Sequence, residues 1–343
     1  MDFRIDIFLP IVCLFFTGIF FFTKLYISYS IRFNMLAKKN NRTLHKQEVP
    51  TGAGIIFSSS TVIAIGLMYY FGILKEGTSL YLSVCALTVA IFGFFDDLFN
   101  LNAVIKFIFQ ILSSTLVLCI LYFHGIPAFL DPPGFYFMLY ICMYLFLLVW
   151  AMNMFNFMDG INGFLSSCAL IVVWSAAFLI YIQIGVSDEL IILFFVGLAC
   201  LTFLFFNFNP AQTFMGDSGS MFLGFTVGAL ILKTTLEQDL EPWVWVILLG
   251  YFIGDCIPTT LYRLFYIKKW YKPHRSHAYQ NLARVLDNHS KVTKMAVFYH
   301  LFWLFPLSLA CLTFPQYSFL LISLSLLPVM LFNFLYGPRY SDS

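Results

Sequence analysis

The stretch Asn153-Met-Phe-Asn156-Phe-Met-Asp159-Gly-Ile-Asn162-Gly163 carries a polar side chain at every third position and lies between two apolar runs. Residues three apart on a helix lie near one face. Amides and carboxylates are costly to remove from water, so in this setting they need a metal, a ligand or a partner side chain. Asn, Asp and Gly are also common at helix ends. Four polar residues at a regular spacing of three favour an active site over a helix cap.

Further carboxylates are supplied by two other motifs. Asp96 and Asp97 are adjacent, and Asp217 lies in Phe214-Met-Gly-Asp217-Ser-Gly219. Adjacent carboxylates repel each other, and a cation or a raised pKa on one member usually holds them together. Oxygen ligands without a Cys/His set favour Mg²⁺ or Mn²⁺. Together with cationic or imidazole groups they suit the binding and transfer of phosphate. The candidates for those groups are Lys106, Arg275 and His277.

The elements that must position these residues are membrane helices. Hydrophobic residues make up 61% of the chain and charged residues 10%, whereas about a quarter of a soluble domain is charged. A membrane-spanning helix needs roughly 20 apolar residues. We therefore expect an all-α polytopic membrane protein, a single domain over 1–343 with about 10–11 transmembrane helices, and no nucleic-acid partner. The apolar runs fall at about 5–27, 52–74, 79–95, 103–123, 135–152, 164–186, 190–206, 219–236, 243–266, 295–314 and 317–335.

The distribution of Lys and Arg predicts the orientation. Two basic loops, 28–50 and 267–294, fall on the same side of the membrane if the chain crosses it eleven times. Cytoplasmic loops are enriched in Lys and Arg, so this side is expected to be cytoplasmic and the N-terminus outside. The polar clusters all fall on the same basic side. The predicted catalytic loops are 28–50, 96–103, 153–163, 207–219 and 267–294.

A cation-coupled transporter is the rival interpretation, because acids within the membrane and broken helices also mark transporters. It predicts acids near mid-membrane and two pseudo-symmetric halves. Asp255 alone lies deep in an apolar run, and no internal repeat is evident. Asp255 is as well explained by pairing with Arg263, two helical turns on, as by a functional role. A purely structural membrane protein would leave the Asp clusters unexplained.

These motifs, in this order, resemble the polyprenyl-phosphate N-acetylhexosamine-1-phosphate transferase family. The resemblance covers about 42–282 and adds Pro50-Thr-Gly-Ala-Gly54, Asp96-Asp97-x-x-Asn100 and a basic loop containing His. It is strongest to the bacterial branch that initiates O-antigen synthesis, through Asn41-Arg-Thr-Leu-His45, Asp255…Thr260-Leu-x-Arg263 and His274-Arg-Ser-His-Ala-Tyr-Gln280. The resemblance implies a bacterial inner-membrane enzyme. It would transfer a sugar 1-phosphate from a UDP-N-acetyl sugar to undecaprenyl phosphate and release UMP.

The resemblance also implies roles for individual residues. Asp217 and Asn156 are similar to the Mg²⁺ ligands of the family. Catalytic roles are expected for Asp96, Asp97, Asp159, Lys106 and His277, with Asp159 near the positions that contact the uridine. Substrate contacts are expected for Lys46, Asn100, Asn153, Asn162, Asn207, His274 and Arg275.

Two departures from the family pattern affect this transfer of roles. Many bacterial members have Asp where this chain has Asn162, although the eukaryotic branch also has Asn. The loop motif here is His-Ala-Tyr-Gln, so Tyr279 and Gln280 replace later histidines. The sequence names neither the sugar nor the oligomeric state, and a homodimer is left open.

Overall fold

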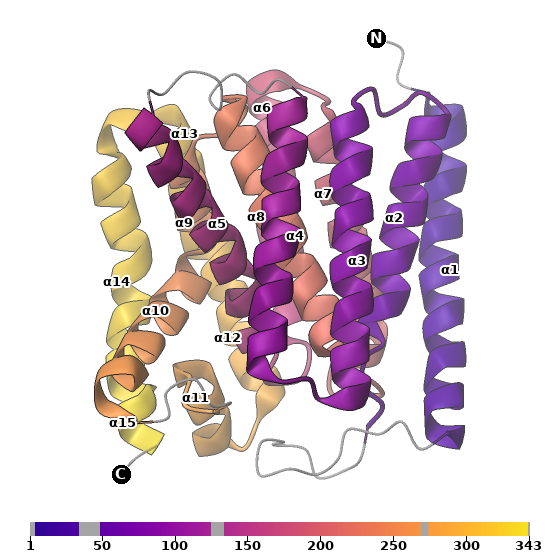
Figure 1. The fold of residues 1–343 in the computed structure, drawn as a ribbon. Helices are drawn as coiled ribbons and strands as arrows, with labels where there is room; N and C mark the ends of the chain where they lie inside the picture. Colours follow the sequence, from indigo (N-terminus) through magenta and orange to yellow (C-terminus); the bar gives the residue numbers. More distant parts are fainter. Residues whose placement is uncertain (1–3, 34–48, 125–133, 269–273, 342–343) are drawn as a thin grey trace.

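The computed structural model describes residues 4–33, 49–124, 134–268 and 274–341, and each of the eleven apolar runs is helical there (Figure 1). A helix satisfies its own backbone hydrogen bonds, as a segment in lipid must. The all-α polytopic membrane fold expected from the sequence is confirmed. The α-helices are α1 (Ile5–Arg32), α2 (Gly54–Tyr70), α3 (Gly77–Phe99), α4 (Ala103–Phe123), α5 (Gly134–Phe157), α6 (Phe164–Ile184), α7 (Asp188–Asn207), α8 (Gly216–Leu236), α9 (Pro242–Leu248), α10 (Gly250–Tyr266), α11 (Ala278–Leu286), α12 (His289–Tyr299), α13 (Phe305–Thr313), α14 (Ser318–Tyr336) and α15 (Pro338–Ser341).

The number of full-length spans is slightly lower than the number of apolar runs. Within the described ranges, 9 helical segments are long and apolar enough to cross a membrane, and 10 if one bent pair counts as a span. The remaining run forms α2, which is apolar but has only 17 residues. The bent pair is α9 and α10, which meet at 77° beside Gly250. Hydropathy is continuous across this bend, so the pattern predicted one straight helix.

Helix α8 forms the centre of the bundle, and 83% of its apolar window is buried inside the protein. It packs against α2, α3 and α5, while α1 lies at one edge of the bundle and α14 at the opposite edge (Figure 1). Small residues permit this close packing, as is usual between membrane helices. A side chain at Gly224 would lie 2.6 Å from the carbonyl oxygen of Ala151 on α5. The helix that carries Asp217 is therefore the most enclosed of the spans.

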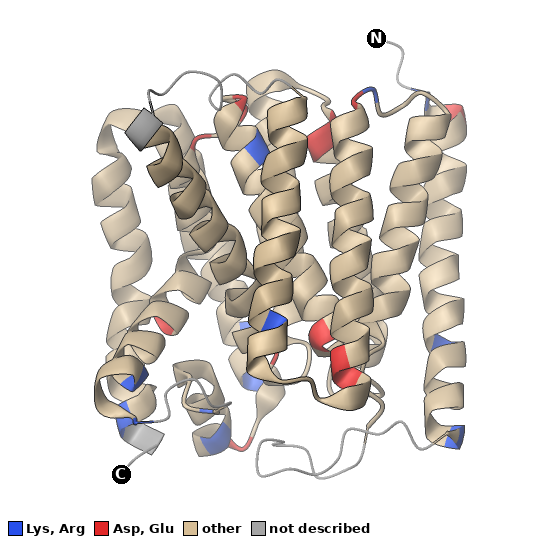
Figure 2. Cartoon of the chain, in the orientation of Figure 1, with Lys and Arg blue, Asp and Glu red and all other residues tan. Residues whose placement is uncertain are grey.

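Most charged residues lie toward the two ends of the bundle (Figure 2). At the end where α7 begins and α8 finishes, the Lys233 ammonium forms ion pairs with Glu76 at 2.8 Å, Glu237 at 2.6 Å and Glu189. The Lys233 side chain is 1% exposed. These three carboxylates could surround a metal ion by their spacing, but the ammonium already lies among them. We refer to Lys233, Glu76, Glu189 and Glu237 as the Lys233 cluster.

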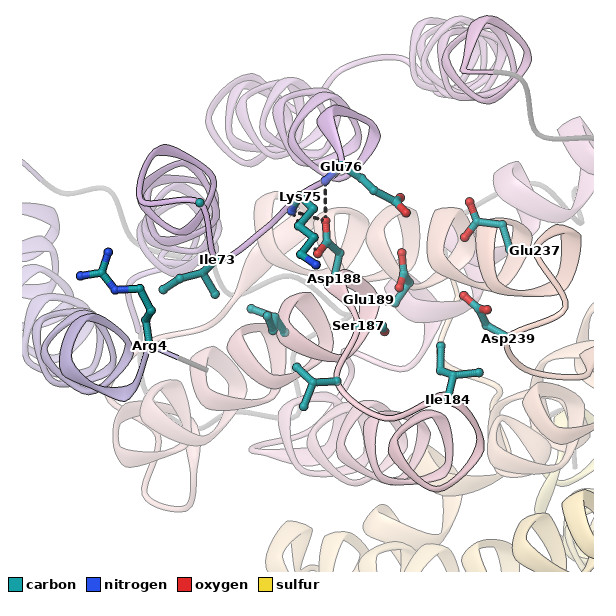
Figure 3. Close-up of a pocket in the computed structure, with 13 residues that line it drawn as sticks. Arg4, Ile73, Lys75, Glu76, Ile184, Ser187, Asp188, Glu189, Glu237 and Asp239 are labelled. Atoms are coloured by element: carbon teal, nitrogen blue, oxygen red, sulfur yellow. Dashed lines mark hydrogen bonds between the residues drawn. The ribbon is translucent and has the colours of Figure 1, made fainter. Parts of the chain in front are cut away.

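A cavity of about 380 Å³ opens beside the Lys233 cluster (Figure 3). The carboxylate of Asp188 borders it and accepts hydrogen bonds from the backbone N–H groups of Lys75 at 3.1 Å and Glu76 at 2.9 Å. Arg4, Glu237 and Asp239 also line it. These charged residues lie together at the end of α8 remote from Asp217.

Candidate functional site

Asp217 lies at the start of α8 and contacts residues from three other helices. Asn156, at the end of α5, donates from Nδ2 to its Oδ1 at 2.8 Å. Lys106, near the start of α4, donates from Nζ to its Oδ2 at 3.1 Å and also forms an ion pair with Asp96 at the end of α3. Ser220 accepts a second hydrogen bond from Asn156 at 3.0 Å. Sequence motifs from four helices therefore form one polar cluster.

The two adjacent acids of α3 have different partners. Asp97 accepts from the backbone N–H groups of Asp217 at 2.8 Å and Ser218 at 3.1 Å, so its carboxylate caps the N-terminus of α8. Negative charge is favourable at this end of a helix. Asp96 instead pairs with Lys106 and accepts from the N–H of Leu101 at 2.8 Å. Neighbouring helical residues point about 100° apart, which separates a capping acid from an acid paired with Lys106.

Gly216 makes the contact between α3 and α8 possible. Its φ is +73°, a region in which residues with a Cβ are uncommon. A side chain there would also overlap the Asp97 carboxylate, lying 2.7 Å from its Cγ. A glycine directly before Asp217 is thus required for Asp97 to reach the start of α8.

The segment 50–54 bonds to the residues at and just before the start of α8. The carbonyl of Pro50 accepts from the N–H of Phe214 at 2.8 Å, and the N–H of Gly54 donates to the carbonyl of Met215 at 3.0 Å. The Ser218 hydroxyl donates to the carbonyl of Gly52 at 3.2 Å. Two motifs more than 160 positions apart are therefore bonded backbone to backbone, which fixes the positions of Phe214 and Met215 just before α8.

Asp159 lies in the turn between α5 and α6, near Gly216 and Asp217. Burial, with the nearby charge of Asp217, raises its pKa to about 7, while a hydrogen bond from the Gly216 backbone acts in the opposite direction. A carboxyl group with such a pKa changes charge near neutral pH. The turn thus adds a titratable group to the cluster around Asp217.

Two other residues are predicted to contact substrate: Asn162 lies in this turn, and Asn207 at the end of α7 bonds to it. Asn207 is buried and bonds with both side-chain atoms: Oδ1 accepts from the N–H of Gly163 at 3.0 Å, and Nδ2 donates to the carbonyl of Thr213 at 3.0 Å. In this arrangement it joins the turn to the end of α7. Asn162 donates from Nδ2 to Asn209 at 3.3 Å, and its buried Oδ1 meets no partner among the residues that the structure describes.

The loop before α11 lies against the Asn153–Gly163 stretch. The ring of Phe157 is 6.1 Å from that of His274 and 5.5 Å from that of His277. The Tyr279 hydroxyl donates to the carbonyl of Phe157 at 2.7 Å. Burial, reinforced by His277 and Arg263, lowers the pKa of His274 to about 3, so this ring is neutral at physiological pH. The carbonyl of Arg275 accepts from Arg284 at 2.6 Å.

The structure therefore brings together most of the site residues predicted from the sequence. The central cluster consists of Asp96, Asp97, Lys106, Asn156, Asp159 and Asp217. The rings of His274 and His277 lie against Phe157, the residue that follows Asn156. Asn153 lies about one turn back along α5 and bonds to Gln110 at 2.9 Å. Asn100 ends α3 in a left-handed conformation with φ +51°. Lys46 and the Asn41–His45 motif lie outside the described residues.

The donor set of the central cluster fits a hard divalent cation. Asp217 and Asn156 are oxygen-bearing side chains already in contact, and half a turn of the Asn156 amide would direct Oδ1 instead of Nδ2 toward the same point. Mg²⁺ prefers oxygen ligands from one or two carboxylates together with phosphate oxygens and water. Asp217 and Asn156 are the residues that would hold it.

Sequence reasoning missed several residues that support the site. Ser220 follows Asp217 by three positions, so helical spacing alone could have identified it. Asp255 was left undecided between two roles, and it accepts hydrogen bonds from the backbone N–H groups of Ala278 and Tyr279 at the start of α11. Asn333 on α14 contacts Asp255 at 3.0 Å and lies in an apolar run with no local signal.

Comparison with known proteins agrees with this geometry. The model for the family described as glycosyl transferase family 4 matches residues 79–235. A probable undecaprenyl-phosphate N-acetylglucosaminyl 1-phosphate transferase of Bacillus subtilis (strain 168) is 26% identical over 262 residues, covering 74% of this chain and 71% of that protein. A phospho-N-acetylmuramoyl-pentapeptide-transferase of Streptococcus equi subsp. equi (strain 4047) is 30% identical over 246 residues, covering 64% and 71%.

A second phospho-N-acetylmuramoyl-pentapeptide-transferase, from Geobacillus thermodenitrificans (strain NG80-2), is 32% identical over 206 residues, covering 56% of this chain and 63% of that protein. The matched regions include the ends of α3, α5 and the start of α8, where the central cluster lies. The family predicted from the sequence motifs is confirmed. The chain belongs to glycosyl transferase family 4, the polytopic membrane enzymes that transfer hexosamine 1-phosphates to polyprenyl phosphates.

Proposed function

We propose that this protein transfers a sugar 1-phosphate from a UDP-N-acetyl sugar to undecaprenyl phosphate. An oxygen of the lipid phosphate would attack the phosphorus that bears the sugar. The bond from that phosphorus to the bridging oxygen would break, and the oxygen would leave with UMP. The product would be undecaprenyl-diphosphate-sugar, the first lipid-linked intermediate of a cell-surface polysaccharide such as O-antigen.

The observation that carries this proposal is the cluster of Asp96, Lys106, Asn156 and Asp217 at one end of the bundle. Both reactants are anionic, so positioning and charge neutralisation dominate catalysis of this kind of transfer. Lys106 would supply a fixed positive charge beside the phosphates. Mg²⁺ held by Asp217 and Asn156, or Mn²⁺ in its place, would neutralise further charge on the diphosphate.

The position of the cluster suits the two substrates. It lies at the end of the bundle where α3 and α5 end and α8 begins, which would be one membrane face. There the lipid can keep its chain in the bilayer while the nucleotide sugar arrives from water. We propose that this face is cytoplasmic and the membrane the bacterial inner membrane, since the Lys and Arg of 28–50 and 267–294 would then obey the positive-inside rule. The N-terminus would lie outside.

The pattern of polar contacts argues against the cation-coupled transporter. A transporter is expected to hold its coupling ion near the bilayer midplane. Here the cluster around Asp217 lies at helix ends, and the carboxylates at the opposite end surround the Lys233 ammonium. The carboxylate of Asp255, on α10, bonds to backbone N–H groups of α11.

The proposal is tested with detergent-purified protein, undecaprenyl phosphate, Mg²⁺ and a panel of UDP-N-acetyl sugars. We expect UMP release with at least one sugar, and its loss when the polyprenyl phosphate is omitted or Mg²⁺ is chelated. Adding Mn²⁺ in place of the chelated Mg²⁺ should recover part of the activity. Release of UMP without the lipid, or no release with any sugar, would contradict the proposal. The panel also identifies the sugar and shows whether it is a 6-deoxy sugar of the O-antigen type.

A further inference from the structure

Asp255 is a fully buried carboxylate on α10 that bonds to the loop containing His277. Its Oδ1 accepts from the N–H of Ala278 at 3.1 Å and lies 3.3 Å from Nδ1 of His277. Its Oδ2 accepts from the N–H of Tyr279 at 3.1 Å. A carboxylate is favourable at a helix N-terminus, where backbone N–H groups are unpaired. Asp255 thus holds the first turn of α11 and the imidazole that precedes it.

Asp255 is itself held by residues from two helices. The Thr259 hydroxyl, one turn along α10, donates to Oδ1 at 3.2 Å. Nδ2 of Asn333, on α14, donates to Oδ1 at 3.0 Å and to the Thr259 hydroxyl at 2.8 Å. The carboxylate therefore has one position, determined by α10 and α14. It transmits that position to His277.

The contact determines which ring nitrogen of His277 is available. An ionised carboxylate only accepts hydrogen bonds, so the nitrogen that faces it must carry the proton. Nδ1 is that nitrogen, which leaves Nε2 as the remaining polar atom of the ring. Nε2 is buried and meets no hydrogen-bond partner within the described parts of the chain. A buried polar atom of this kind requires a partner, and the ring lies 5.5 Å from that of Phe157, next to Asn156.

We propose that Asp255 is a positioning residue that directs Nε2 of His277 to the nucleotide sugar. This inference rests on the proposed function, since it assigns His277 a contact with that substrate. Asp255 touches no reacting atom. It acts by orienting the ring and by keeping the proton on Nδ1, a role that carboxylates also have toward histidines in metal sites.

A double-mutant cycle separates positioning from simple support of the fold. The single variants are Asp255→Asn, His277→Gln and His277→Asn, and kcat and KM for the UDP-sugar are measured for each. Gln carries its terminal amide near the position of Nε2, whereas Asn carries it near Nδ1. We expect His277→Gln to retain more kcat/KM than His277→Asn, because Nε2 is the atom that meets the substrate. The reverse order would overturn the assignment.

Asp255→Asn should lower kcat/KM at least about tenfold in the wild-type background. In the His277→Gln background it should cost less than about threefold, because the contact it disturbs is already lost. Equal losses in both backgrounds would overturn the proposal and leave Asp255 as a structural cap only. Asp239→Asn, at the opposite end of the bundle, is the matched control and should leave kcat/KM unchanged.

A measurement without substrate keeps the inference separate from the proposed function. In protein labelled with ¹⁵N-histidine, the ring signals of His277 are assigned by their loss in His277→Gln. Nδ1 should carry a proton in the wild type, and Asp255→Asn should move part of the population to the other tautomer. A wild-type ring protonated on Nε2 alone, or no change in Asp255→Asn, would overturn the positioning role even if no UDP-sugar were turned over. Absence of turnover with the expected tautomer would instead contradict only the proposed function.

Discussion

The side-chain amide of Asn156 donates a 2.8 Å hydrogen bond to Asp217, although 61 positions separate the two residues. The contact joins the end of α5 to the start of α8, the most enclosed helix of the bundle. Lys106 contacts the other oxygen of the same carboxylate. Asp217 therefore lies between an amide and an ammonium, and an anionic substrate approaching this point would meet both.

Substitutions of Asp96 and Asp97 should differ in their effect on the thermal stability of the protein. Asp97→Asn places an NH₂ group against one of two backbone donors at the start of α8, and loss of a helix cap typically costs about 0.5–2 kcal/mol. Asp96→Asn leaves this cap intact. Thermal unfolding in detergent should show a lower midpoint for Asp97→Asn than for Asp96→Asn. Equal midpoints would contradict the capping role of Asp97.

The same two substitutions should also differ in how the activity of each variant depends on pH. We expect both variants to lose activity, since a general base contributes typically about 10²–10⁴-fold. We propose that Asp96, which pairs with Lys106, is the acid that acts on the lipid phosphate, whose second pKa is near 6. Only Asp96→Asn should regain part of its activity as pH rises from about 6 to about 9. If both variants keep the wild-type pH profile, neither acid is a base and the pair acts only through its charge.

The basic loop should show residue-specific effects. Arg275→Ala should lower the rate at least about tenfold, the effect of losing a charge-assisted contact of about 1.5–3 kcal/mol. His277→Ala should lower it by a similar factor, because the substrate loses its contact with Nε2. Lys268→Ala removes an exposed positive charge of the same region and should have little effect. Initial rates of UMP release for the three variants provide the comparison. A similar loss in all three would mean that only the total charge of the loop matters.

The parts of the fold and site that depend on local sequence could be predicted. The parts that depend on contacts between segments far apart in the sequence could not. The helices follow from apolar runs, and the central residues from motifs whose chemistry is visible locally, such as Asp96-Asp97 and the Asn153–Gly163 stretch. The bend between α9 and α10 has no counterpart in hydropathy. The bonding of 50–54 to 213–218 could not be predicted either, because nothing within one segment indicates the other as its partner.

Asp255 and Asn207 have roles in the structure that could not be predicted from the sequence alone. Asp255 lies in an apolar run, eight positions before Arg263. Nothing near it indicates that its partners are His277 and the first two residues of α11, 22 to 24 positions away. Asn207 was assigned a substrate contact by resemblance. In the structure both of its polar atoms are engaged in bonds between α6, α7 and the 213 turn. Such roles depend on tertiary contacts that spacing does not determine.

The Lys233 cluster should stabilise the fold without affecting chemistry. Lys233→Met would leave Glu76, Glu189 and Glu237 facing one another without the ammonium. Breaking a buried ion pair costs about 3–5 kcal/mol; we expect the lower end, because the Glu76 side chain is 52% exposed. Thermal unfolding measures the loss, and the control is Lys75→Met, which removes an exposed side chain nearby. Unchanged stability in Lys233→Met would contradict this account of the cluster.

Asp159 should make stability depend on pH in the absence of metal. Its pKa in the folded protein, about 7, is above the ordinary value of 3.8, so the folded state binds more protons than the unfolded state between about pH 4 and 7. Stability should therefore fall as pH rises through this window. Asp159→Asn removes this contribution, and its stability relative to wild type should be greater at pH 8 than at pH 5. A pH-independent difference between the two proteins would contradict the raised pKa.

The transfer of a phosphate together with the sugar is tested most directly by following the phosphorus. A UDP-N-acetyl sugar labelled with ³²P at the sugar-linked phosphate is incubated with the protein, undecaprenyl phosphate and Mg²⁺, and the lipid phase is extracted. The account predicts that the label enters the lipid phase in the wild type and in Asp239→Asn, but not in Asp217→Asn, which should remain folded. Label that stays in the water phase as UDP, while the sugar itself becomes lipid-soluble, would contradict it.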